Sequence, residues 1–180
     1  SQGVWRKQQA RFAKLARCRS DARPAVALAV LAVFIGSTCS AQPLTLDIGT
    51  KGDPASLATQ LLEASGVQGG LIVHVGCGDG QLPAALQKAT GSLVHGLATE
   101  PASLEQARRR IEDAGNYGRV SVELFRKGKL PYVDNLVNLL VVDQPEGLST
   151  DEMMRVLAPG GAACVRRGQS YTVRVKPWPE

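Results

Sequence analysis

Cysteine is scarce in this chain, with four in 180 residues. Small exported proteins that depend on disulfides carry cysteine at a much higher density. Only Cys77 and Cys164 lie beyond residue 41, the first in a glycine-rich turn and the second in a late apolar stretch. A disulfide framework is therefore not expected, because two such isolated cysteines do not form one.

A basic surplus is missing from most of the chain, although the formal net charge is +5. Residues 1–41 hold seven of the 21 basic side chains and one of the 16 acidic ones. The remainder, residues 42–180, therefore carries 14 basic and 15 acidic side chains, a net charge of −1. A domain with this balance has no excess charge with which to neutralise phosphates, so nucleic-acid binding is not indicated.

Long hydrophobic runs are also missing. The stretch AVALAVLAVFIG, residues 25–36, has twelve apolar or small residues, whereas a helix that crosses a bilayer needs about 20. Basic residues precede it and the small residues STCSAQ follow it, an order typical of a secretory signal with cleavage after Ala41. We therefore interpret residues 1–41 as a signal peptide, with a retained anchor and a buried N-terminal helix as alternatives.

The interpretation of residues 1–41 determines where the protein is expected to be located and how it is expected to contact the membrane. A genuine signal implies an exported or periplasmic protein, and its absence a cytoplasmic one. Any contact with the membrane is expected only through this N-terminal signal or anchor, and residues 1–41 are expected to pack poorly on the domain that follows. Cys39 raises a lipoprotein alternative, but the residues before it lack the apolar side chain usual at the start of such a motif.

Helical and strand patterns alternate from residue 53 onward. This alternation predicts an α/β fold with a doubly wound, mainly parallel, Rossmann-like sheet, whose ligands bind at the carboxyl ends of the strands. We place the domain at residues 42–168, and take residues 169–180 as an exit strand and linker to a further C-terminal region, so that the sheet lacks a complete C-terminal end. The expected helices are 53–66, 81–89, 101–114 and one that begins with a capping box of Ser149 and Glu152; the expected strands are 71–75, 93–98, 120–125, 136–142 and 162–165.

The stretch LIVHVGCGDGQL, residues 71–82, joins the first of these strands to a helix through three alternate glycines. Gly76, Gly78 and Gly80 remove side chains where the backbone can approach a ligand, and the following helix offers unpaired N–H groups. The alternative is that the glycines only make a tight turn. Asp79 is expected to hold the turn through its own backbone, and Cys77 to act as a small apolar filler.

Four stretches occur in a characteristic order: VHVGCGDG, VHGLATEPASLEQAR, LPYVDNLVNLLVV and RVLAPGG. With them the chain resembles the class I S-adenosylmethionine-dependent methyltransferases, of the methyltransferase type 11-like kind. It resembles more narrowly the methyltransferase-like domain that precedes a quinone-type β-propeller in some exported bacterial proteins. The resemblance implies S-adenosylmethionine as cofactor, a possible C-terminal propeller as partner, and no metal. It places the turn residues Gly76, Cys77, Gly78, Asp79 and Gly80 at the cofactor.

The family usually carries three acidic residues that this chain replaces with His74, Ala98 and Arg126. Alanine cannot accept the two hydrogen bonds of a ribose diol, and each lost charged partner costs about 1.5 to 3 kcal/mol. Cofactor binding is therefore expected to be weak or lost. The remaining positions that the resemblance places at the cofactor are Ala98, Thr99, Glu100, Arg126 and Asp143.

Several of these residues have a second interpretation. Glu100 can replace the missing ribose ligand, but Pro101 after it also makes Glu100 an N-cap. His74 is most simply a core histidine with backbone partners, and Asp143 a turn former in the loop DQPE. Arg108, Arg109 and Arg110 share a helix with nearby acids and are expected to form a solvated face.

Two functions follow from these observations. The first is a methyltransferase with an unknown acceptor and a possibly degenerate cofactor site, for which no catalytic residue can be assigned, because methyl transfer depends mainly on positioning. The alternative is a non-catalytic binding or docking module of an exported multidomain protein. A nicotinamide-dependent oxidoreductase is disfavoured, because the glycine spacing is Gly-x-Gly-x-Gly and not Gly-x-Gly-x-x-Gly.

Overall fold

The structure is a computed structural model that describes residues 44–46, 53–126 and 128–179. The segment predicted to be a signal peptide or anchor, residues 1–41, lies outside the described residues. Within the described part of the chain, no helix combines the length and the apolar character needed to cross a membrane.

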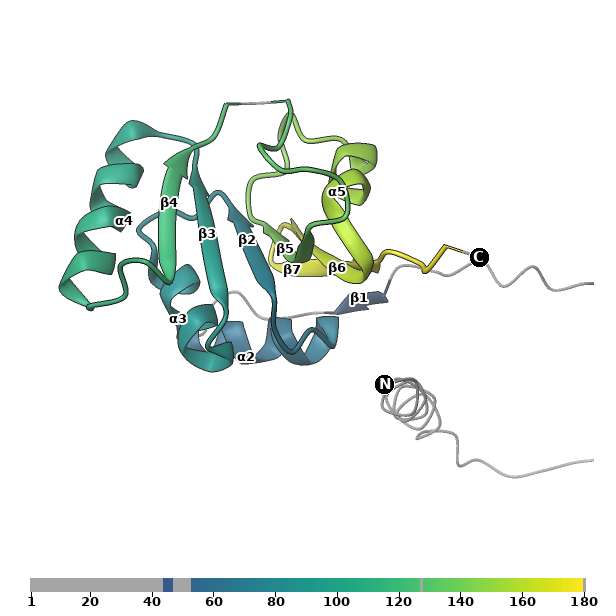
Figure 1. Cartoon of the computed structure of the whole chain (residues 1–180), viewed down its shortest axis with the longest axis horizontal. Helices are drawn as coiled ribbons and strands as arrows, with labels where there is room; N and C mark the ends of the chain where they lie inside the picture. Colours follow the sequence, from purple (N-terminus) through teal and green to yellow (C-terminus); the bar gives the residue numbers. More distant parts are fainter. Residues whose placement is uncertain (1–43, 47–52, 127, 180) are drawn as a thin grey trace, which may run out of the picture. The chain divides into compact units, whose positions relative to one another are not determined.

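The described strands form one seven-stranded sheet in the order β1-β7-β6-β5-β2-β3-β4. The five strands from β2 to β6 run parallel to one another. Both neighbours of β2 are parallel to it, which confirms the predicted doubly wound, mainly parallel α/β fold (Figure 1). The strands are β1 (Leu44–Leu46), β2 (Leu71–Val75), β3 (Leu93–Ala98), β4 (Val120–Leu124), β5 (Val137–Val142), β6 (Leu157–Arg167) and β7 (Ser170–Val175).

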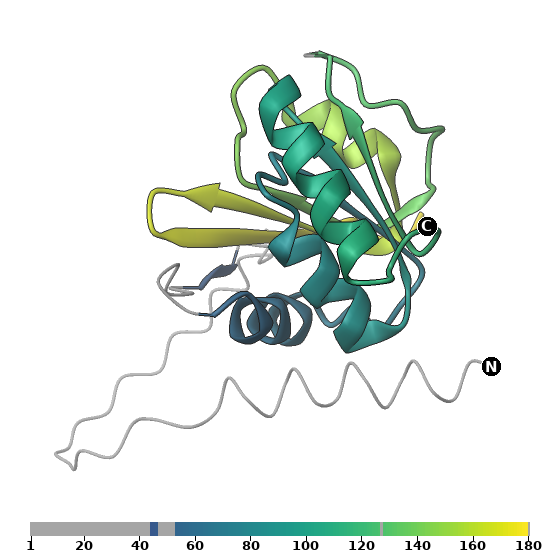
Figure 2. The same cartoon turned by 90° about the vertical axis from the view of Figure 1, so that its left-hand side faces the viewer.

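Helices cover both faces of the sheet, and each face has its own apolar core (Figure 2). Alternate residues of a strand point to opposite faces, so Ile72 joins one core and Val73 the other. The first core packs against α2 (Pro54–Ser65), α3 (Gln81–Thr90) and α4 (Pro101–Asp113). The second packs against α5 (Thr150–Val156) and the loop between β4 and β5.

The C-terminal strand lies inside the sheet. The strand predicted in residues 169–180 is present as β7, and it pairs antiparallel with β6 on one side and with β1 on the other. The tight β6-β7 connection allows this antiparallel return, whereas a parallel strand would need a long crossover. The sheet therefore extends past the domain boundary that the sequence suggested.

Several local details differ from the sequence interpretation. Asp53 precedes α2, but its side chain makes no capping hydrogen bond, and the helix instead begins with Pro54 and ends at the left-handed Gly66. The segment APGG forms part of β6, where the pairing with β5 is irregular between Val137 and Leu139. β6 thus begins at Leu157, five residues before the predicted start.

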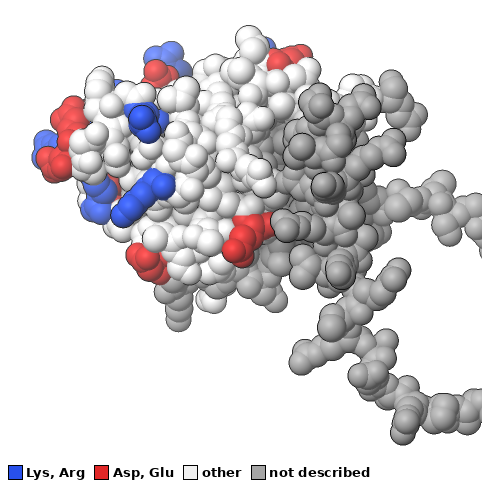
Figure 3. All heavy atoms as spheres, turned by 60° about the horizontal axis from the view of Figure 1, so that its bottom comes forward, with Lys and Arg blue, Asp and Glu red and all other residues white. Residues whose placement is uncertain are grey.

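Charged side chains of both signs are interspersed over the described part of the face in Figure 3. The arginines of α4 pair with nearby acids: Arg108 lies 3.5 Å from Glu105 and Arg110 lies 3.3 Å from Asp79. These pairs agree with the solvated face predicted for this helix.

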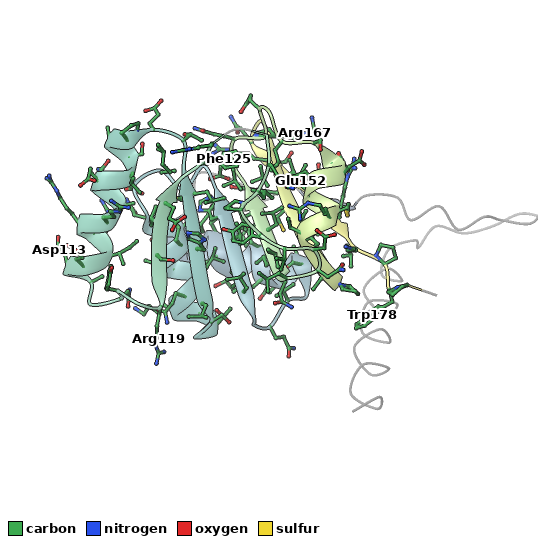
Figure 4. All side chains as sticks on the ribbon, turned by 45° about the horizontal axis from the view of Figure 1, so that its top comes forward. Asp113, Arg119, Phe125, Glu152, Arg167 and Trp178 are labelled. Carbon is green, nitrogen blue, oxygen red and sulfur yellow. The ribbon has the colours of Figure 1, made fainter. Side chains whose placement is uncertain are left out.

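The capping box at the start of α5 is only half formed. Ser149 accepts a hydrogen bond from the Glu152 N–H at 3.1 Å. The carboxylate of Glu152, which is labelled in Figure 4, does not return this bond. It accepts hydrogen bonds from Arg155 and from the Leu130 N–H. Arg155 in turn donates to Asp134 and to the carbonyls of Leu130 and Tyr132. Glu152 and Arg155 therefore attach the loop between β4 and β5 to α5.

This network predicts a specific response to acid. Hydrogen bonds from Arg155, together with the Leu130 N–H, outweigh partial burial and hold the pKa of Glu152 at about 2, below its ordinary value of 4.5. A carboxyl group with a lowered pKa stabilises the fold above its unfolded-state pKa, and this contribution is lost as the pH falls through the folded-state pKa. We expect Glu152→Gln to lower the melting temperature at pH 7 by a few degrees and to flatten the pH dependence between pH 4.5 and pH 2.

The measurement is thermal unfolding followed by circular dichroism over this pH range. Glu105→Gln is the matched control, because Glu105 pairs with Arg108 on an exposed helix surface, where ion pairs contribute little. Parallel stability curves for the wild type and Glu152→Gln would contradict the assignment.

Candidate functional site

The glycine turn follows the carboxyl end of β2 and leads into α3. The backbone of the turn is fixed by hydrogen bonds from the Gly76 and Cys77 N–H groups to the Leu97 carbonyl, at 2.8 and 3.3 Å. The turn glycines have φ values of 81° at Gly76, 51° at Gly78 and 81° at Gly80, a region that side chains disfavour. The sequence requirement for glycine at these three positions is therefore partly conformational.

The space around each glycine shows which of them is packed against the rest of the protein. A side chain at Gly76 would meet Gln144 at 3.1 Å, and one at Gly80 would meet Ala107 at 3.1 Å. At Gly78 nothing lies within 4 Å of the position that a Cβ would take. Packing within the protein thus explains two of the glycines, whereas Gly78 leaves an open surface beside the turn.

The other two turn residues have structural partners. Asp79 accepts a hydrogen bond from the Gln81 N–H at 3.2 Å, as expected of a residue that holds the turn. Cys77 is buried and contacts the position of Gly96, where an added Cβ would lie 3.0 Å from its sulfur atom. Burial raises the pKa of the Cys77 thiol to about 12, so this side chain serves as an apolar filler and not as a nucleophile.

A cavity of about 280 Å³ opens beside the turn. It lies between the start of α2, the glycine turn and the carboxyl ends of β2 and β5, where an open parallel sheet is expected to bind ligands. Polar side chains from four strands or strand ends reach its wall: His74, Asp143, Arg166 and Tyr171.

Asp143 stands at the centre of this polar wall. Its Oδ2 atom lies 3.1 Å from Nε2 of His74, and its Oδ1 atom accepts a hydrogen bond from the Tyr171 hydroxyl. His74 and Tyr171 have 1% and 0% of their surfaces exposed. The three side chains therefore form a buried chain of hydrogen bonds that joins β2, β5 and β7.

The charge of Asp143 is maintained despite its burial. Burial raises the pKa of Asp143, but the hydrogen bond from His74 and its charge, the hydrogen bond from Tyr171 and the charge of Arg166 outweigh burial, so the net pKa is lowered. Burial and the hydrogen bond to Asp143 raise the pKa of Tyr171. Asp143 is therefore ionised and Tyr171 protonated at neutral pH.

His74 differs from the prediction in its partner. It is a core residue, as expected, but its hydrogen bond goes to the Asp143 carboxylate and not to the backbone. Its other nitrogen, Nδ1, is buried and has no hydrogen-bond partner among the described residues. Such unpaired buried atoms are rare and call for an explanation.

The predicted site residues that follow β3 and β4 lie outside the cavity wall. Ala98 is completely buried in the core under α4, and Thr99 is half-buried. Glu100 occupies the N-cap position of α4, but its exposed side chain makes no capping hydrogen bond. Arg126 is exposed just beyond β4. The cavity wall includes Gly76, Cys77, Gly78, Asp79 and Asp143 of the predicted residues, and does not include Gly80, Ala98, Thr99, Glu100 or Arg126.

Comparison with known families decides the assignment of this fold. The sequence pattern of the family described as "Methyltransferase domain" matches residues 72–161, half of the chain. The chain belongs to this family. The match covers the strands from β2 to β5, the glycine turn and the start of β6, and the cofactor of the family is S-adenosylmethionine.

Individual proteins resemble this methyltransferase domain over its central part. The methyltransferase GfsG of Streptomyces halstedii is 34% identical over 116 residues, which cover 61% of this chain and 42% of GfsG. The chain thus spans less than half of the length of this curated relative.

Solved structures share the fold at lower sequence identity. An S-adenosylmethionine-dependent methyltransferase structure from Methanococcus maripaludis, described as putative, has a TM-score of 0.57 and 24% identity, over 65% of this chain and 56% of that one. A geranyl diphosphate C-methyltransferase from Streptomyces coelicolor, solved with S-adenosyl-L-homocysteine, has a TM-score of 0.56 and 20% identity, over 62% and 44% of the two chains.

The residues of the methyltransferase domain fit the cofactor at one end of the site. The open surface at Gly78 leaves room for a close approach to the backbone, and the cavity beside it holds an unpaired buried nitrogen, Nδ1 of His74. Residues 53–126 and 128–179 contain no group of three or more His, Cys, Asp or Glu side chains placed to hold a metal ion.

Sequence reasoning missed Arg166 and Tyr171. Both belong to the β6-β7 hairpin, and Tyr171 lies beyond the boundary that was placed at residue 168. An apolar and aromatic alternation in SYTVRV was the available signal, because the buried residues of β7 are Tyr171 and Val173.

Proposed function

We propose that this domain binds S-adenosylmethionine at the glycine turn and transfers its methyl group to an acceptor of unknown identity. The observation that carries the proposal is the open surface at Gly78 beside a cavity with a polar wall, at the carboxyl ends of β2 and β5. The bound cofactor supplies an electrophilic methyl group on a sulfonium ion. The residues of the chain would bind and orient it, with Gly76, Gly78, His74 and Asp143 at its methionine end.

We favour a degenerate cofactor site, in which some of the usual ligand residues are lost. Ala98 offers no acceptor for the ribose hydroxyl groups, and Arg126 replaces an acid near the adenine position. Losing one such charged partner costs about 1.5 to 3 kcal/mol, which corresponds to roughly a ten- to hundredfold loss of affinity. We expect a dissociation constant for S-adenosylmethionine well above the micromolar range.

The alternative function is a non-catalytic module that keeps the fold for binding or docking. Ala98 and Arg126 stand where the family usually has acids, and their presence favours the non-catalytic module because it weakens the cofactor site. The finer resemblance to domains ahead of a quinone-type β-propeller, and with it export through residues 1–41, belongs to this proposal. Secretion of a reporter fused after residue 41 would test the export signal directly.

Calorimetric titration of residues 42–180 with S-adenosylmethionine separates these functions. Weak, saturable binding supports the degenerate methyltransferase, and an absence of binding at millimolar concentration supports the non-catalytic module. Binding at about micromolar affinity or better would contradict the proposed degeneracy.

Glu100 provides a more specific prediction for the ribose end. Its carboxylate is exposed and makes no capping bond to α4, which leaves it available to accept hydrogen bonds from ribose hydroxyl groups. If Glu100 replaces the missing ribose acceptor, Glu100→Gln should weaken S-adenosylmethionine binding by roughly ten- to hundredfold. Glu112→Gln, an exposed change at the other end of α4, should leave the affinity unchanged.

Ala98→Asp tests the alternative that Glu100 does not contact the ribose of the cofactor. If Glu100 does not contact the ribose, a carboxylate at position 98 restores the missing acceptor and strengthens binding. Ala98 is completely buried, so this variant is also expected to be less stable, because a buried carboxylate loses its hydration. Its affinity should therefore be measured well below its melting temperature. Unchanged affinity in both variants would exclude a ribose contact at either position.

A further inference from the structure

β4 forms one edge of the described sheet, so one side of its backbone has no neighbouring strand (Figure 1). The Arg119 carbonyl accepts a hydrogen bond from the Val94 N–H, and the Phe125 N–H donates to the Ala98 carbonyl. The odd-numbered residues therefore direct their backbone groups toward β3, and by alternation the even-numbered residues direct theirs outward. The outward residues are Val120, Val122 and Leu124.

The outward side of β4 has two free hydrogen-bond donors. The Val120 N–H is engaged, because it donates to the Asn116 carbonyl at 3.0 Å. The N–H groups of Val122 and Leu124, and the carbonyls of all three outward residues, have no hydrogen-bond partner among the described residues. Such a row of unpaired backbone groups is a template for pairing with another strand.

The side chains near this edge do little to prevent such pairing. Three large apolar residues expose 57%, 77% and 43% of their surfaces: Leu93, Tyr117 and Leu124. β4 contains one charged residue, Glu123, and has neither a proline nor a bulge. Edge strands that avoid association usually carry several charges, a proline or a bulge.

The free groups match those of a second copy in a specific register. In an antiparallel pair, two opposite residues exchange hydrogen bonds, so the outward residues of one copy must face those of the other. With the two copies of Val122 opposite each other, each Val122 N–H meets the Val122 carbonyl of the other copy. Each Leu124 N–H then meets the Val120 carbonyl of the other copy. Both free donors are satisfied in this register, and the bond from Val120 to Asn116 stays in place.

The neighbouring registers are less favourable. A pair centred on Glu123 also satisfies both donors, but it places the two carboxylates directly opposite each other, which is destabilising. A pair centred on Ser121 places Leu124 opposite Gly118, whose φ of 92° is not that of a strand. The pair centred on Val122 instead places Ser121 opposite Glu123, where the hydroxyl can donate to the carboxylate.

We propose that two copies of this chain associate through β4, in an antiparallel pair centred on Val122 that joins their sheets into one. A twofold axis makes this contact self-complementary, so it closes as a dimer. Leu124 of each copy then packs beside Val120 of the other and loses exposed apolar surface. The inference is independent of the proposed function, because β4 contributes no residue to the cavity beside the glycine turn.

Sedimentation equilibrium of the full chain tests the association. We expect a reversible equilibrium between monomer and dimer. Leu124→Pro and Leu124→Ala both shorten the side chain, but only proline removes the N–H group. Leu124→Pro should therefore raise the dissociation constant of the dimer roughly tenfold above that of Leu124→Ala. Proline is tolerated where the N–H of an edge strand faces outward, and circular dichroism checks the fold of both variants.

Substitutions at Ser121 test the register. Ser121 is exposed, so these changes should not affect the fold. Ser121→Lys places a cation opposite Glu123 of the other copy and should strengthen the dimer several-fold, whereas Ser121→Glu should weaken it several-fold. Weakening by both variants would indicate that Ser121 faces itself and would overturn the proposed register.

Amide hydrogen exchange locates the interface within the chain. Protection of the Val122 and Leu124 amides should increase with protein concentration, whereas that of the Val120 amide, which is already bonded, should not. A wild type that stays monomeric at about millimolar concentration would overturn the inference, even if β4 then pairs with a different protein. A dimer with equal dissociation constants for Leu124→Pro and Leu124→Ala, and with unchanged exchange at Val122 and Leu124, would also overturn it, because the association would then involve another part of the chain.

Discussion

Asp143→Ala is expected to lower the free energy of unfolding by about 2 to 6 kcal/mol, because two buried donors lose their acceptor and each costs about 1 to 3 kcal/mol. The variant leaves the His74 Nε2–H and the Tyr171 hydroxyl without an acceptor, and both side chains are almost completely buried. Each unsatisfied donor carries its own desolvation cost. Urea unfolding at pH 7 measures the loss.

Two further variants delimit this effect. Glu146→Ala changes an exposed carboxylate in the same loop and should have little effect on stability. Tyr171→Phe removes one of the two hydrogen bonds and should cost about 1 kcal/mol. The pKa of Asp143 is lowered in the fold, so the advantage of the wild type over Asp143→Ala should shrink as the pH falls through that pKa. A cost of less than about 1 kcal/mol for Asp143→Ala would show that the buried chain of hydrogen bonds contributes little.

Gly161→Ala is expected to lower the free energy of unfolding by about 2 to 3 kcal/mol, in the upper part of the range for overpacked sites. A Cβ at this position would lie 2.9 Å from the carbonyl oxygens of Ala158 and Asn138 and 3.0 Å from that of Val137. Backbone oxygens cannot move aside as a flexible side chain can, so the irregular pairing of β5 with β6 would have to change.

Gly69→Ala is the matched control for this site. Like Gly161, Gly69 has no positive φ, and the nearest atom to an added Cβ is the hydroxyl oxygen of Ser92 at 3.3 Å. A hydroxyl group can rotate away, so this change should cost well below 1 kcal/mol. Thermal unfolding of the two variants under identical conditions gives the comparison. Equal melting temperatures would mean that the close contacts at Gly161 relax without cost.

The parallel part of the sheet could be predicted closely from the sequence, because its strands are short apolar runs bounded by residues that end a strand or helix, such as glycine. β2 and β3 have the predicted limits, and Gly80 and Gly91 bracket α3 with left-handed backbones. The hairpin of β6 and β7 could not be placed in the same way. Its position depends on the pairing of β6 with β5 and of β7 with β1, and no local pattern specifies a partner strand.

In the candidate site too, features made by neighbouring residues could be predicted from the sequence, whereas contacts between distant residues could not. The glycine turn is contiguous, so its geometry follows from residues 76–80. The contact of His74 with Asp143 joins residues 69 positions apart, and that of Asp143 with Tyr171 joins residues 28 positions apart. The sequence marks His74 and Asp143 by their positions within or after apolar strands, but their pairing depends on the three-dimensional arrangement of β2, β5 and β7.

The attachment of the loop between β4 and β5 has a consequence for local unfolding. One guanidinium, that of Arg155, holds the carbonyls of Leu130 and Tyr132 and the side chain of Asp134. Because these bonds share a single donor group, the loss of Arg155 would remove all of them at once, and we expect residues 130–134 to open as one cooperative unit. Amide protons such as that of Leu130, which bonds Glu152 in the same network, would then exchange with solvent by a shared opening and not by separate fluctuations.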